Sequence, residues 1–136
     1  MPLALTWSQI SLRFFCAVVA AGVIGMNRTE HGPAAGLRTS SLVCVSSCVA
    51  IIQVNLLLPM AGRHGDSLVM NGLMRLPLGI LSGMGFIGAG AILRRDTLVT
   101  GVTTAATMWF LTVIGLCFGG GQISLGTAAA AIGLFT

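Results

Sequence analysis

The length of its uncharged stretches constrains this chain more than any other feature. Charged side chains are absent from four stretches, at residues 14–27, 39–62, 76–93 and 97–136. An α-helix needs about 20 mainly apolar residues to cross about 30 Å of hydrocarbon. The first stretch is shorter than this and must recruit the preceding turn, which contains Arg13, and glycines at 119–121 interrupt the last. The sequence therefore predicts five spans, at residues 8–26, 40–60, 74–93, 99–118 and 123–136.

Short connections join these spans, so neighbouring helices are expected to run antiparallel. The predicted fold class is all-α, a polytopic transmembrane helical bundle with four full spans and a partial fifth. Residues 1–136 form a single transmembrane domain in this prediction, without a soluble C-terminal domain. The partial fifth span favours a truncated chain over a helix that ends inside the membrane. Strands of alternating polarity, which a membrane β-barrel requires, are not found.

Charge supports the membrane assignment. Only 7% of the residues are charged, against about 25% in an average globular protein, so charges could not cover a soluble surface. The net charge of +4 comes from arginines scattered between apolar runs, which is typical of caps on membrane spans and not of nucleic-acid binding. The first and third loops hold four arginines and the opposite side three, which favours an N-terminus outside the cytoplasm.

The stretch GMGFIGAG at residues 83–90 contains the G-x-G-x-x-G pattern of dinucleotide-binding loops. Such a site also needs a preceding strand and an acidic residue about 20 positions later, whereas no acid follows Asp96 here. A helix fits better, because at about 100° per residue one face carries Gly79, Gly83, Phe86 and Gly90. We expect this span at the centre of the bundle, packed on two sides. In the alternative, its glycine carbonyls line a path or a partner groove.

Four motifs follow one another along the chain in a specific order. The first is GVIGMNR at 22–28 with GLRT at 36–39, and the second is Arg75 followed by SGMGFIGAGAI at 82–92. The third is GVTTAA at 101–106 with Trp109, and the fourth is Ile114-Gly115 followed by Gly119 and Gly121. In order and spacing over residues 20–121, the chain resembles the MgtC/SapB family of bacterial inner-membrane proteins.

The resemblance implies a non-enzymatic protein of the bacterial inner membrane, with roles in survival at low magnesium, acid tolerance and virulence. It implies regulation of other membrane proteins, such as the proton-driven ATP synthase or a transporter. The family has also been described as a magnesium transporter, so a magnesium or proton channel or transporter is the alternative function. Many members carry a soluble C-terminal domain, which is not part of the prediction for this chain. The family usually has Glu where this chain has Asn27.

A polar cluster around the first loop is one candidate functional site. Its members follow the first span or begin the second, and they are Asn27, Arg28, Glu30, Arg38 and Thr39. In the simpler interpretation they are a polar helix cap and a snorkelling arginine. In the functional interpretation they contact a partner or an ion. Asparagine offers a carbonyl but cannot titrate, so a proton site that used the family's Glu would be lost.

A second candidate is a helix-packing or pathway face on the third and fourth spans. It comprises Arg75, Gly79, Gly83, Gly85, Gly88, Gly90, Thr103 and Thr104. The hydroxyls of Thr103, Thr104 and Thr107 are expected to bond back to carbonyls one turn earlier, or to form a polar track beside the glycines. Arg13, inside the first span, is expected to snorkel to the interface, with a buried pair as the alternative. Asp66 is the only acid on its predicted side.

Catalytic and metal chemistry find little support in the sequence. The four cysteines, Cys16, Cys44, Cys48 and Cys117, lie in apolar runs where thiols stay protonated and inert. The predicted spans contain no Asp, Glu or His, and no nucleophile–base pair is recognisable, so we expect no catalytic residue, metal or cofactor. The expected partners are the lipid bilayer and other membrane proteins, not nucleic acid. Self-association is left open.

Overall fold

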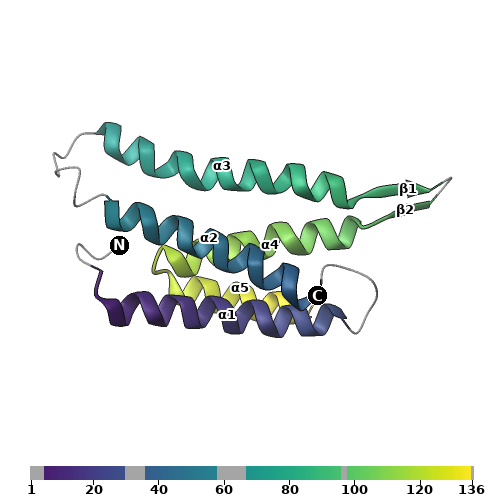
Figure 1. Ribbon diagram of the computed structural model, residues 1–136, viewed down its shortest axis with the longest axis horizontal. Coiled ribbons are helices and arrows are strands. Elements are labelled where there is room, and N and C mark those ends of the chain that lie inside the picture. Colours follow the sequence, from purple (N-terminus) through teal and green to yellow (C-terminus); the bar gives the residue numbers. More distant parts are fainter. Residues whose placement is uncertain (1–4, 30–35, 58–66, 96–97, 136) are drawn as a thin grey trace.

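Helices that run back and forth along one axis make up almost all of the computed structural model (Figure 1). The structure describes residues 5–29, 36–57, 67–95 and 98–135, without the side chains of 28–29, 67–74 and 94–95. The elements are α1 (Trp7–Thr29), α2 (Leu37–Leu57), α3 (Ser67–Ala91), β1 (Leu93–Arg95), β2 (Leu98–Thr100), α4 (Val102–Gly119) and α5 (Ile123–Phe135). This order confirms the predicted all-α class.

Contacts between helices confirm that sequence neighbours run antiparallel. Cys44 Sγ of α2 lies 3.6 Å from the Ala17 carbonyl oxygen of α1, and Cys48 Sγ lies 4.0 Å from that of Arg13, so the numbering runs in opposite directions. The alternation continues along the chain, so α1, α3 and α5 share one direction (Figure 1). The consequence is that Asn27 and the start of α4 lie at one end of the bundle, and Arg13 and the end of α4 lie at the other.

Among the described residues, three helices are long and apolar enough to cross a membrane: α1 over Trp7–Asn27, α2 and α4. The prediction of four full spans is confirmed only for these three. The third predicted span corresponds to α3, which has 25 residues and ends at Ala91 instead of residue 93. The partial fifth span corresponds to α5, which has 13 residues.

A short β-hairpin between α3 and α4 was not expected. Strands β1 and β2 pair antiparallel, with Leu93 opposite Thr100 and Arg95 opposite Leu98. The hairpin extends beyond the helices at one end of the bundle (Figure 1). Gly101 joins it to α4 with φ of 88°, and a Cβ there would collide with the Ala91 carbonyl oxygen. Only glycine accepts both this left-handed conformation and the close approach.

The core lies where α1, α2 and α4 meet. Two glycines of α4, Gly115 and Gly119, lie against the backbone of α2. A Cβ at Gly115 would collide with the Cys44 carbonyl oxygen and Ser47 Oγ, and one at Gly119 would lie 2.5 Å from the Cys48 carbonyl oxygen. Small residues at such a seam let two helices approach closely, which increases the dispersion contacts between them.

The expectation that the third span lies at the centre of the bundle is wrong. Helix α3 lies along one edge and packs mainly against α4 (Figure 1). Gly88 makes this contact, because a Cβ there would be 3.4 Å from the Ala105 side chain. A Cβ at any of Gly79, Gly83, Gly85 and Gly90 would meet no described atom within 4 Å. The glycine periodicity identified a smooth face, but the chain itself leaves most of this face uncovered.

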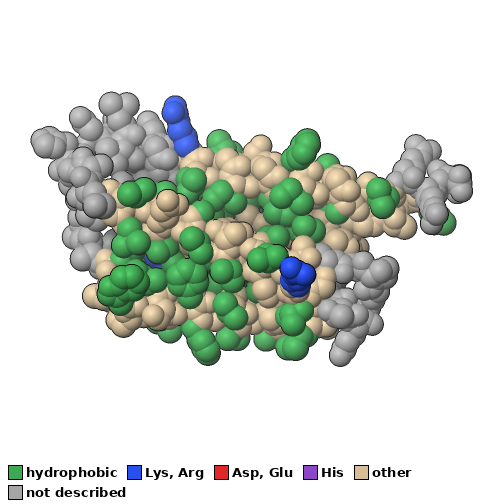
Figure 2. Space-filling model, viewed as in Figure 1, with side chains coloured by type: hydrophobic (Ala, Val, Ile, Leu, Met, Phe, Trp, Pro, Cys, Tyr) green, Lys and Arg blue, Asp and Glu red, His purple; other side chains and the backbone are tan. Residues whose placement is uncertain are grey.

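The described surface is apolar along most of its length. Figure 2 shows hydrophobic side chains distributed over the visible face, with few arginine side chains among them. Large apolar side chains on this outer surface include Trp7, Phe15, Leu78 and Phe86, which are 83%, 67%, 69% and 84% exposed. Such a surface is unfavourable in water and suits the hydrocarbon of a bilayer.

Candidate functional site

Asn27 joins two ends of the chain. Its side-chain amide nitrogen donates a hydrogen bond of 3.4 Å to the Leu134 carbonyl oxygen, near the end of α5. Gly25, half a turn earlier in α1, lies against α2, where a Cβ would be 3.0 Å from the Leu37 Cα and 3.1 Å from the Ser40 side chain. The contacts therefore tie α1, α2 and α5 together at what we call the Asn27 end of the bundle.

The structure brings part of the predicted first-loop cluster to this end. Arg38, in the first turn of α2, is exposed, and Thr39 beside it is half-buried. Arg28 continues α1 beyond Asn27, but its side chain is not described, and Glu30 lies outside the described residues. Asn27 itself bonds to a helix carbonyl, which fits the interpretation of a polar cap.

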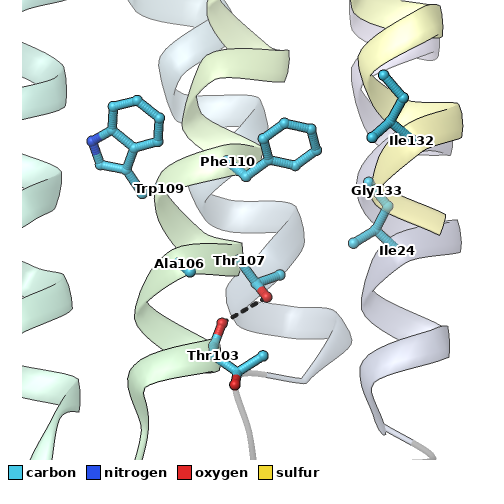
Figure 3. A pocket seen from close by; sticks show the side chains of 8 residues that line it. All are labelled: Ile24, Thr103, Ala106, Thr107, Trp109, Phe110, Ile132 and Gly133. Carbon is cyan, nitrogen blue, oxygen red and sulfur yellow. Dashed lines mark hydrogen bonds between the residues drawn. The ribbon is translucent and has the colours of Figure 1, made fainter. Parts of the chain in front are cut away.

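A cavity of about 400 Å³ opens between α1, α4 and α5 (Figure 3). Thr107 Oγ1 donates a hydrogen bond of 2.8 Å to the Thr103 carbonyl oxygen, so this hydroxyl bonds back one turn, as the sequence predicts. Apart from these two threonines the wall is apolar, and the cavity therefore suits an apolar group better than a hydrated ion. Its lining residues are Ile24, Thr103, Ala106, Thr107, Trp109, Phe110, Ile132 and Gly133.

Only some members of the predicted packing or pathway face contact another helix or the cavity. Thr103 is exposed at the cavity and Thr104 is half-buried in the first turn of α4. Gly88 packs on α4, whereas Gly79, Gly83, Gly85 and Gly90 meet no neighbouring helix. Arg75 is exposed, nearer the opposite end of α3. Gly79, Gly83 and Gly90 share one outward face of α3, and none of the uncovered glycines lines a path through the described bundle.

Arg13 does not snorkel in the structure. Its side chain is only 3% exposed, and its Nη1 donates a hydrogen bond of 2.7 Å to the Gly119 carbonyl oxygen. This carbonyl is one of the last of α4, where the helix dipole places partial negative charge. Arg13 therefore caps α4 from inside the bundle. Asp66, its predicted partner, lies outside the described residues.

The cysteines serve packing in this structure. The thiols of Cys44 and Cys48 point at the α1 carbonyl oxygens of Ala17 and Arg13, across the α1–α2 interface. Within the described ranges, no group of three His, Cys, Asp or Glu side chains could hold a metal ion. The thiols therefore act as small, weakly donating core residues.

The Gly115–Gly119 seam was not expected from the sequence to be the close-packed element. Its signal was present, because the two glycines lie four residues apart in an apolar run, as in the small-xxx-small pattern of membrane helices. The glycines of α3 carry the same pattern and drew the prediction to the wrong helix.

Three long apolar helices, a core sealed by small residues and an apolar outer surface define a polytopic α-helical membrane protein. Within this class the chain belongs to the MgtC family, whose family model matches residues 14–136. This membership confirms the resemblance that the four sequence motifs carry.

Three curated relatives illustrate the similarity. The chain is 35% identical to protein SrpB of Synechococcus elongatus, over 96% of this chain and 74% of SrpB. It is 35% identical to the "Putative magnesium transporter YhiD" of Escherichia coli (strain K12), over 88% of this chain and 54% of YhiD. It is 33% identical to protein MgtC of Brucella abortus, over 88% of this chain and 48% of that protein. The chain thus spans about half the length of the last two. No solved structure matches the chain significantly.

Proposed function

We propose that the protein is a non-enzymatic regulator that binds other membrane proteins through the outer face of α3. One observation carries the proposal: Gly79, Gly83 and Gly90 share one face of α3, and no described atom lies within 4 Å of a Cβ at any of them. The expected occupant is a transmembrane helix of a partner protein. The proposed setting is the bacterial inner membrane, with the N-terminus outside, during adaptation to low magnesium or acid.

The physical basis is close approach of backbones. Lipid tails are as apolar as leucine side chains, so two membrane helices associate by packing and not by the hydrophobic effect. Glycines remove side-chain bulk and admit a second helix, while Phe86, which is 84% exposed on the same face, offers a ridge that a partner could enclose. The α4 seam at Gly115 and Gly119 uses the same principle inside this chain.

The family supports the setting of this role. Family resemblance suggests a component of energy or ion homeostasis, such as the ATP synthase or a transporter, as the partner. The chain spans about half of YhiD and of the Brucella MgtC. We therefore propose this class of partner and identify it by the crosslinking experiment below.

Photo-crosslinking in native membranes tests the proposal. A photoreactive residue at position 86 is expected to capture the same protein reproducibly, and one at position 15 on α1, where Phe15 is 67% exposed, is not. Gly83→Leu should abolish capture without unfolding the protein, because the position faces open space. Gly22→Leu is the matched control, since a Cβ at Gly22 also meets nothing within 4 Å but lies on α1. Equal capture by the two leucine variants would refute a docking role for α3.

A magnesium or proton channel or transporter is the second candidate. The printed name of YhiD, "Putative magnesium transporter", favours it. Flux of both ions through liposomes that contain the purified, monodisperse protein is the direct measurement. Flux above that of empty liposomes would support transport. Flux equal to that of empty liposomes would leave the regulator as the better account.

A further inference from the structure

Arg13 has more hydrogen-bonding capacity than the bundle uses. A guanidinium has five N–H donors, but the described residues supply one acceptor, the Gly119 carbonyl oxygen at 2.7 Å from Nη1. The side chain is almost fully shielded from solvent, with 3% exposure. A helix C-terminus carries only about half an elementary negative charge, so it offsets part of the arginine's full positive charge. A bound anion would neutralise the remaining positive charge of Arg13.

Asn55 supplies a second donor without a partner. Its side chain is 7% exposed, and its amide nitrogen makes no hydrogen bond to any described residue. Buried donors are almost always paired, and an unpaired donor is especially costly in a helix surrounded by lipid. Asn55 therefore needs an acceptor that the described residues do not provide.

The register of the helices places these two groups at the same end of the bundle. Cys48 lies level with Arg13, since its Sγ is 4.0 Å from the Arg13 carbonyl oxygen. Asn55 follows Cys48 by two helical turns on the same buried face of α2, about 10 Å nearer the end of the bundle. Side chains tilt toward the N-terminus of their own helix, so Arg13 extends toward that end and Asn55 leans back toward Cys48.

The turn after α4 contacts the Arg13 guanidinium. Gly121 has φ of 81°, and a Cβ there would lie 2.7 Å from Arg13 Nη2, so glycine leaves the space that the guanidinium occupies. This turn lies at the end of a membrane-spanning helix. Arg13 is also only six residues from Trp7, about 9 Å along α1. Because tryptophan is enriched at the membrane–water interface, the guanidinium is expected within reach of the lipid headgroups.

We propose that Arg13 and Asn55 bind a phosphate oxyanion at this end of the bundle. The planar guanidinium matches the geometry of two phosphate oxygens, and the Asn55 amide donates to another. The phosphate is either that of a phospholipid headgroup or a free phosphate. This site is at the opposite end of the bundle from Asn27 and does not depend on the proposed regulatory role of α3.

Thermal unfolding of the full chain in maltoside micelles, which contain no phosphate, tests the site. Inorganic phosphate and short-chain phosphatidylglycerol are titrated separately at constant ionic strength, with chloride as the reference. A ligand that binds only the folded protein raises the unfolding temperature as its concentration passes the dissociation constant. Tighter binding of the lipid assigns the site to headgroups, and equal affinity assigns it to the free oxyanion. No shift with either ligand would overturn the proposal.

Variants at Asn55 keep the test independent of the helix cap. Asn55→Leu should weaken binding at least tenfold. Asn55→Asp should fold and lose phosphate binding, because its carboxylate would neutralise Arg13. Unchanged binding in either variant would overturn the proposal. Arg75→Gln, which removes an exposed arginine from the same half of the bundle, should bind like the original protein. If phosphate binds only to the Asp66→Asn variant, the Asp66 carboxylate is the anion that neutralises Arg13. That result would also overturn the proposal.

Discussion

Replacing Gly115 by alanine is expected to destabilise the protein, because α4 has no room there for a Cβ. The added methyl group would collide with the Cys44 carbonyl oxygen and with Ser47 Oγ. The serine can change rotamer, but the carbonyl belongs to the backbone of α2 and is fixed by that helix. The two helices would therefore have to separate along the seam that continues to Gly119.

The magnitude follows from the weaker dispersion attraction between α2 and α4 after they separate. A separation of ~1 Å removes about a quarter to a half of the attraction of each atom pair, and each pair contributes about 0.1–0.2 kcal/mol. Over ~20 atom pairs along the seam this amounts to ~1 kcal/mol. Strain from overpacking adds about 1–3 kcal/mol. The expected decrease in the free energy of unfolding is therefore about 2–4 kcal/mol.

Detergent-induced unfolding, followed by circular dichroism and tryptophan fluorescence, measures this change. Gly83→Ala is the matched control, because it makes the same substitution inside a membrane helix but meets no described atom within 4 Å. It is expected to be neutral or to stabilise by up to ~1 kcal/mol through helix propensity. Adding Ser47→Ala to Gly115→Ala should restore part of the loss. If Gly115→Ala proved as stable as Gly83→Ala, the close-packed seam would be refuted.

Three further changes test other parts of the structure. Arg13→Met should lower the free energy of unfolding by about 1.5–3 kcal/mol, because it removes a charge-assisted hydrogen bond to Gly119, and Arg13→Lys should lower it by less; equal losses would argue against the cap. Gly101→Ala should cost at least about 1–2 kcal/mol in the same assay, since φ is 88° and the Ala91 carbonyl oxygen blocks a Cβ. Asn27→Glu restores the residue usual in the family and should improve growth at low magnesium or acid pH, whereas unchanged growth would show that Asn27 is only a cap.

The candidate sites were partly accessible to sequence analysis. Thr107 bonds back to Thr103 as expected, since a hydroxyl in a helix has a carbonyl one turn earlier within reach. Arg13 was expected to snorkel because a single sequence shows its depth in a span but not the helix that it faces. Its partner, the Gly119 carbonyl, is 106 residues away in the chain and has no side-chain signature.

The hairpin between α3 and α4 illustrates a different limit. Its strands have three residues each, which is too short for an alternating pattern to stand out. The two arginines in β1 and the polar residues that follow read equally well as a membrane-side loop. What fixes the hairpin is the tight connection through Gly101, and this requirement becomes visible only when Ala91 is in place.

The sequence by itself determined that this chain forms antiparallel membrane helices and where most of them begin and end. Those properties follow from the hydrocarbon thickness, from the uncharged stretches and from the short connections, all of which are local. Only the tertiary structure decided that Gly115 and Gly119, and not the glycines of α3, form the close-packed seam. In helices that are apolar on every side, no polar face marks the outside, so the choice of contacting faces depends on shape and on which backbone groups meet.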